Sequence, residues 1–107
     1  MQHEIYAVTS VEVVGDYKLR LIFDDGKEQT INFQPVLEGE LFGPLKDPAL
    51  FAQVRIDEVA RTIIWPNGAD FDPATLHDWN IYESDLVAGA NRRLHAAESS
   101  TSYTIAK

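Results

Sequence analysis

Two aspartates separated by one residue are the strongest candidates for chemistry in this sequence. Asp70 and Asp72 flank Phe71, so in an extended segment both carboxylates would point to the same side. Paired carboxylates can bind a divalent metal or divide acid and base roles between them. The same residues also suit a structural role, because Asp72 precedes Pro73 and can cap a helix while Asp70 orders a turn. We favour the structural interpretation and keep a metal-dependent or acid–base enzyme at Asp70, Asp72 and His77 as an alternative.

The histidines do little to strengthen the enzyme hypothesis. His3, His77 and His95 lie far apart in the sequence, without the close ligand spacing of a zinc motif. Asp78 follows His77 and could relay a proton, but we expect His77 to face solvent. The absence of cysteine excludes disulfides, thiol nucleophiles and cysteine-based metal sites. Because the sequence also has neither a Gly-x-Ser-x-Gly motif nor a P-loop, we predict no enzymatic activity, metal or cofactor.

A basic pair and an apolar stripe near the C-terminus could bind a partner. Arg92 and Arg93 form the only basic cluster, which could contact phosphate or an acidic surface but would also suit the negative end of a helix. Leu86, Ala90 and Leu94 recur every four residues and would share one face of a helix. We predict that these residues contact a partner.

The net charge of −8, from nine Lys and Arg against seventeen Asp and Glu, restricts the partners. The excess falls in residues 1–80, whereas residues 81–107 are neutral. Nucleic acids and anionic membranes attract basic proteins, so we expect neither to bind the main domain. The sequence has no apolar run near the ~18 residues of a membrane span, and Met1-Gln2-His3-Glu4 has no basic signal-peptide region. We expect a cytoplasmic protein whose partner is basic.

The elements that must position these residues fit one domain, because 107 residues leave room for only one. We predict a single α+β domain over residues 1–80, a C-terminal helical extension over 81–97 and a flexible tail over 98–107. Trp65 and Trp79 are expected to pack in its core.

The first elements are three predicted antiparallel strands. Residues 5–14 form a strand whose alternation breaks between Thr9 and Ser10, which predicts a bulge. Apolar and polar residues alternate over 17–23 and again over 27–33. The intervening Asp24-Asp25-Gly26 favours a tight hairpin turn, because glycine adopts the positive φ that such a turn needs.

Helices and a second hairpin follow. Asp47-Pro48 and Asp72-Pro73 each favour a helix start, with Asp as the cap and Pro in the first turn. Residues 54–57 and 62–65 resemble the strands of a hairpin, and a last helix is predicted over 84–97. The order is therefore β-β-β-α-β-β-α plus a C-terminal helix, a small mostly antiparallel sheet with helices on one face.

Part of this pattern resembles an uncharacterised bacterial family, domain of unknown function 2442, over residues 8–79. The resemblance lies in Tyr17-x-Leu19-x-Leu21-x-Phe23-x-Asp25-Gly26, in Pro44-Leu45 and Phe51, and most specifically in Trp65-Pro66-Asn67-Gly68-Ala69-Asp70. The Glu58–Arg61 turn departs from the pattern, because it lacks an expected glycine. The resemblance implies a small α+β domain without established catalytic residues. Some relatives carry a helix-turn-helix region, and others are encoded beside a second small protein in arrangements that suggest toxin–antitoxin pairs.

Our leading hypothesis is a non-enzymatic protein-interaction or regulatory module, the antitoxin-like half of a small bacterial gene pair. Its partner would be another small protein of basic character. The alternatives are a component of a DNA-binding transcriptional regulator acting through the C-terminal helix and the metal-dependent enzyme described above. The segment after residue 80 is too short for a complete helix-turn-helix domain, so we do not predict base reading. A homodimer is compatible with each hypothesis, because an open sheet edge needs covering.

Overall fold

The computed structural model describes the backbone of residues 6–106 and the side chains of residues 6–92. It contains two antiparallel sheets with helices, which confirms the predicted α+β class. The elements in chain order are β1 (Val8–Gly15), β2 (Lys18–Phe23), β3 (Glu28–Asn32), the 3-10 helix η1 (Gln34–Val36), α1 (Gly39–Phe42), the 3-10 helix η2 (Gly43–Lys46), α2 (Pro48–Phe51), β4 (Arg55–Asp57), β5 (Thr62–Ile64), α3 (Pro73–His77) and α4 (Trp79–Ala106).

Strands β1, β2 and β3 form a meander in that order, as the alternation predicts. The inward residues of β2 and β3 are fully or almost fully buried: Leu19, Leu21, Phe23 and Ile31. The β1–β2 pairing shifts register between Val8 and Ser10, which confirms the bulge expected at Thr9–Ser10. One face of the meander is therefore committed to the core.

The second hairpin, β4–β5, forms a sheet of its own instead of extending the first. It joins β1 where the Val8 amide donates to the Arg61 carbonyl oxygen at 3.0 Å. Arg61 has a φ of +61°, so it occupies the left-handed conformation for which the family pattern led us to expect a glycine nearby. The turn keeps that backbone shape with a non-glycine residue.

The core is a cluster of aromatic rings around Phe33. The ring centroids of Phe51, Trp65, Phe71 and Trp79 each lie between 5.2 and 6.2 Å from that of Phe33. Trp65 and Trp79 are buried, which confirms that both pack in the core.

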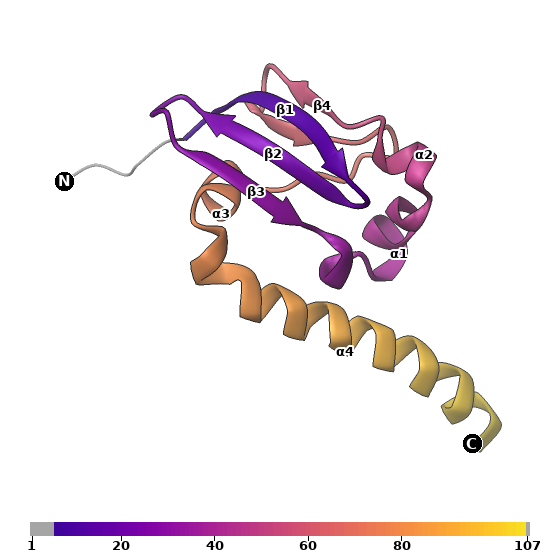
Figure 1. Ribbon diagram of the computed structural model, residues 1–107. Coiled ribbons are helices and arrows are strands. Elements are labelled where there is room, and N and C mark those ends of the chain that lie inside the picture. The colour runs from indigo at the N-terminus through magenta and orange to yellow at the C-terminus, as the bar shows by residue number, and fades with distance from the viewer. Residues whose placement is uncertain (1–5, 107) are drawn as a thin grey trace.

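Helix α4 is longer than the helix predicted over residues 84–97. It begins at Trp79, directly after Asp78 ends α3, and it runs to Ala106. The predicted start at Ser84 was wrong, because only one residue, Asp78, separates α3 from α4. No glycine or proline marks this position in the sequence. The predicted end at Ala97 was also wrong, since the helix continues through the Ser/Thr-rich segment. In Figure 1, α3 and α4 lie below the three-stranded sheet, and the C-terminal half of α4 extends past the other elements.

Candidate functional site

The most specific sequence motif, residues 65–70, forms a turn after β5 that we call the Trp65 turn. The Gly68 amide donates to the Trp65 carbonyl oxygen, and the Trp65 amide donates to the Ala69 carbonyl oxygen, each at 2.9 Å. Trp65 is 1% exposed, and its indole Nε1–H donates to the buried carbonyl oxygen of Phe51 at 2.9 Å. The indole therefore ties the turn to the end of α2.

Asn67 and Gly68 complete the Trp65 turn. The Asn67 amide nitrogen Nδ2 donates to the Leu41 carbonyl oxygen in α1 at 2.9 Å, and its Oδ1 accepts from the Ala69 amide at 3.1 Å. Gly68 has a φ of +91°, a conformation that disfavours any residue with a Cβ atom. Each of these residues has a role in joining β5 to α1 and α2, so the motif is explained by folding.

Asp70 and Asp72 do not converge on a shared site with His77. The Asp72 Oδ2 atom accepts from the Thr75 amide at 3.2 Å and caps α3, whereas Asp70 forms a backbone bridge with Ile64 and is exposed. Across the part of the chain that the structure describes, no group of three His, Cys, Asp or Glu residues could hold a metal ion. The geometry that the enzyme alternative requires is thus not found at these residues.

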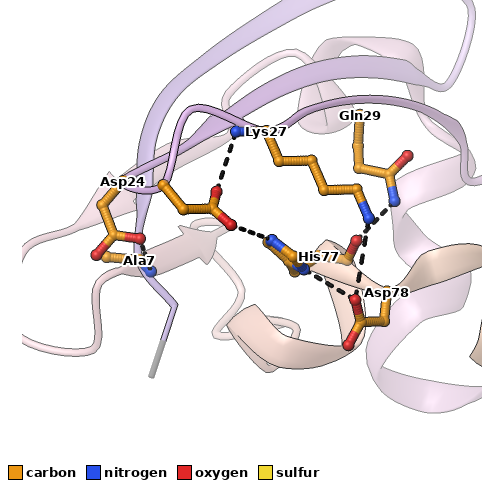
Figure 2. Close-up of polar contacts among 7 residues, drawn as sticks. Ala7, Asp24, Lys27, Gln29, His77 and Asp78 are labelled. Atoms are coloured by element: carbon orange, nitrogen blue, oxygen red, sulfur yellow. Dashed lines mark hydrogen bonds and ion pairs between the residues drawn. The ribbon is translucent and has the colours of Figure 1, made fainter. Parts of the chain in front are cut away.

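His77 is buried, and the prediction that it faces solvent was wrong. It is 7% exposed, and each of its ring nitrogens contacts a carboxylate. Nδ1 lies 2.8 Å from Asp78 Oδ1, and Nε2 lies 2.7 Å from Asp25 Oδ2. We call His77, Asp25 and Asp78, with the residues that contact them, the His77 cluster (Figure 2).

Aromatic rings cover the imidazole. The Tyr6 ring stacks on it with centroids 3.6 Å apart and planes 8° apart, and the Phe23 ring meets it edge-on at 5.0 Å. The two rings come from the segment before β1 and from the end of β2. They exclude water from the imidazole and leave its nitrogens to the carboxylates.

Residues of the β2–β3 hairpin complete the His77 cluster. The Lys27 amide donates to Asp25 Oδ1 at 3.0 Å, and this bond, together with the His77 contact, lowers the pKa of Asp25. The Lys27 ammonium lies 3.9 Å from Asp78 Oδ1, and the Gln29 side-chain amide donates to the His77 carbonyl oxygen at 2.8 Å. Figure 2 shows these contacts around His77. The cluster therefore joins the hairpin to the residue between α3 and α4.

A second charged group lies on the opposite face of the three-stranded sheet. Arg20 contacts Glu28 through Nε and Glu12 through Nη1. The hydrogen bond and charge of Glu28 raise the pKa of Arg20, and the same bond lowers the pKa of Glu28. All three side chains are at least 39% exposed, so we expect the group to contribute little to stability.

The residues predicted to bind a partner occupy different surroundings on α4. Ala90 is fully buried and Leu86 packs against the core, whereas Arg92 is exposed. The side chains of Arg93 and Leu94 lie outside the described residues. Ala90 and Leu86 thus anchor α4 to its own domain, and a partner would meet other residues while the helix stays docked.

The exposed surface of α4, which we call its outward side, carries exposed apolar residues and borders a groove that reaches the core-facing Val87. Ile81 is 67% exposed and Tyr82 is 41% exposed. An open groove of about 490 Å³ follows the helix and is lined by Asn80, Glu83, Ser84, Val87, Ala88 and Asn91. The repeat of Leu86, Ala90 and Leu94 predicted one apolar face, and its described members Leu86 and Ala90 anchor α4 to the domain. The repeat therefore did not indicate the exposed residues of the outward side.

Comparison with known families gives one result. A family model described as "Protein of unknown function (DUF2442)" matches residues 8–82, in agreement with the resemblance over residues 8–79. No curated protein and no solved structure matches the chain. Among the described residues, no helix has the length and apolar character needed to cross a membrane.

Proposed function

The chain belongs to the DUF2442 family of proteins of unknown function, and from that premise we propose that it is a non-enzymatic protein-interaction module with α4 as its docking element. The partner is a second small protein of basic character, and the specific role is the antitoxin-like half of a bacterial gene pair. The observation that carries this proposal is the position of α4, whose C-terminal half extends past the rest of the domain (Figure 1).

The length of α4 exceeds what its anchoring needs. Its 28 residues span about 42 Å at 1.5 Å per residue. Among the side chains that the structure describes, those of α4 that pack in or against the core are Trp79, Leu86, Val87 and Ala90. Helices gain most of their stability from packing of an apolar face, and Gly89 lowers the intrinsic stability of this one. A partner along the projecting part would supply the missing contacts.

Charge favours a basic partner on the outward side. Glu83 and Asp85 are exposed on α4, and within the described residues neither forms an ion pair. The whole chain carries a net charge of −8, which speeds encounter with a positively charged surface and disfavours a second copy. Ile81 and Tyr82 add apolar area beside these carboxylates.

The experiment compares two variants that add the same charged side chain at different places. Ala88→Arg fills the groove on α4, and Ala60→Arg, the matched control, lies at an exposed position in the β4–β5 turn. Each variant and the unmodified chain are tagged, purified from the organism that encodes them, and weighed by native mass spectrometry. We expect a defined complex with a second small basic protein for the unmodified chain and for Ala60→Arg, and its loss for Ala88→Arg.

Three outcomes would contradict the proposal. A bare monomer or a homodimer of the unmodified chain would remove the basic partner. An intact complex with Ala88→Arg would mean that the partner does not bind at the groove. Copurified DNA released steeply by salt would favour the DNA-binding alternative.

A further inference from the structure

Both nitrogens of the buried His77 ring contact carboxylate oxygens, and this geometry determines how many protons the ring must carry. The two contacts are 2.8 Å to Asp78 and 2.7 Å to Asp25. A neutral imidazole donates from one nitrogen and presents a lone pair at the other, whereas the protonated ring donates from both. While both carboxyl groups are ionised, both contacts are hydrogen bonds at the same time only in the protonated ring.

The surroundings of the ring suit the charged form. The Lys27 amide and then His77 lower the pKa of Asp25, which favours its ionised form. The Oδ1 atom of Asp78 lies 2.8 Å from His77 Nδ1 and 3.9 Å from the Lys27 ammonium. The Tyr6 ring stacks over the imidazole at 3.6 Å, an arrangement that stabilises a cation. Loss of one proton would turn one of the two hydrogen bonds into a repulsion between a lone pair and a carboxylate.

Asp78 also lies directly before α4, at a junction that we call the root of α4. It ends α3, and its carbonyl oxygen accepts from the Ile81 amide in the first turn of α4 at 2.8 Å. Its side chain faces His77, and its amide donates to the Ala74 carbonyl oxygen at 3.0 Å. Any change in the Asp78 contact with His77 therefore acts directly on the residue from which α4 starts.

We propose that the His77 cluster is a proton-dependent lock on the root of α4, closed when His77 is protonated and loosened when the ring becomes neutral. Among the residues that the structure describes, the charged or titratable groups that face the ring or its partners are Asp25 from the β2–β3 turn, Asp78 from the α3–α4 junction, Lys27 just before β3, and Tyr6 before β1. A rise in pH loosens the junction and lets α4 move relative to the domain. The consequence for partner binding rests on the proposed function, whereas the lock itself is a property of the isolated chain.

The test measures the ring and the junction in the isolated chain, with no partner present. Nitrogen-15 NMR of the histidine ring distinguishes the doubly protonated form from either neutral tautomer across about pH 5 to pH 8. Hydrogen exchange of the Ile81 amide, corrected for intrinsic base catalysis, reports opening at the root of α4. The Gly68 amide, bonded in the Trp65 turn, serves as the internal reference. We expect Ile81 protection to fall about tenfold relative to Gly68 as the ring loses its proton.

Three variants separate the lock from general destabilisation. His77→Gln should show no pH-dependent change in Ile81 protection, because its side chain does not titrate. Asp25→Asn should reduce the change, since its amide can donate to the unprotonated nitrogen of a neutral ring. Asp70→Asn, at an exposed position outside the cluster, should behave as the unmodified chain.

A ring with only one protonated nitrogen throughout that pH range would overturn the inference. Equal pH dependence of the Ile81 and Gly68 amides would do the same, as would an Asp25→Asn response identical to that of Asp70→Asn. Asp25→Asn keeps the test valid if His77→Gln does not fold. Because no partner is used, these results do not depend on whether α4 is a docking element.

Discussion

The Trp65 turn and helix α4 differ in what their side chains and backbone groups contact. In the turn, the Trp65 indole, the Asn67 amide and the Gly68 amide donate to backbone oxygens of the same domain. On α4, Ile81 is 67% exposed, and one side of the helix lines an open groove.

This difference shows that a specific sequence motif need not mark a binding surface. The Trp65 turn carries the most specific motif of the chain, yet its polar groups serve the fold. Helix α4 carries a weak pattern, and its exposed side is the surface that we propose binds a partner. A distinctive motif can therefore reflect the residues that a particular turn requires in order to fold. Mutations in the two regions should have separable effects.

The largest expected effect is on stability in the Trp65 turn. Trp65→Ala removes a side chain that is 1% exposed, and we expect the free energy of unfolding to fall by about 3 to 5 kcal/mol. Chemical denaturation followed by circular dichroism measures this change. If that variant does not fold, Trp65→Phe should lower the free energy by about 0.5 to 1.5 kcal/mol, since it removes the indole donor and leaves the Phe51 oxygen with only the Val54 amide at 3.3 Å. If either variant lost less stability than the range given for it, the Trp65 turn would not be a main source of stability for the fold.

A second substitution tests the backbone of the same turn. Gly68→Ala places a Cβ atom on a residue whose φ is +91°, while no other atom lies within 4 Å of that position. The cost should therefore come from the backbone alone, about 1 to 2 kcal/mol, measured by the same unfolding experiment. A neutral result would mean that the turn tolerates another backbone shape.

The His77 cluster, which lies between the two regions, should contribute to stability in a pH-dependent way. The pKa of Asp25 is lower in the folded chain, mainly because of the Lys27 amide and then because of His77. Its carboxylate thus stabilises the fold above the ordinary Asp pKa of 3.8, and this contribution is lost as pH falls through the lower folded pKa. Asp25→Asn should show a shallower loss of stability in acid than the unmodified chain, measured by urea unfolding. An identical acid profile would contradict this role of Asp25.

The smallest effect on stability is expected on the outward side of α4. Ile81→Ser changes a residue that is 67% exposed, so the free energy of unfolding should change by less than about 0.5 kcal/mol. Binding to the copurified partner should nevertheless weaken, as measured by isothermal titration calorimetry. Large destabilisation with unchanged binding would reverse the contrast between the two regions.

Local patterns predicted much of the fold. Alternation over residues 17–23 and 27–33 predicted β2 and β3, and its break at Thr9–Ser10 predicted the bulge. The two Asp-Pro pairs predicted the caps of α2 and α3. Each of these features depends on residues close in sequence, where spacing alone carries the physical cause.

The His77 cluster could not be predicted in the same way. Asp25 and His77 are 52 residues apart, and only the packing of α3 against the β2–β3 hairpin brings them together. His77 also stands beside Asp78 on a short helix, a setting that is typical of an exposed residue. The outward side of α4 was missed for a related reason, because Leu86 and Ala90 follow the helical period required by the domain's own core.

The most direct test of α4 as the docking element is hydrogen exchange of the chain alone and in the complex purified from its own organism. We expect the complex to slow exchange along α4, including the amides near Ile81, and to leave the Trp65 turn unchanged. Slower exchange confined to the sheet or to the Trp65 turn, with α4 unaffected, would contradict the role assigned to this helix.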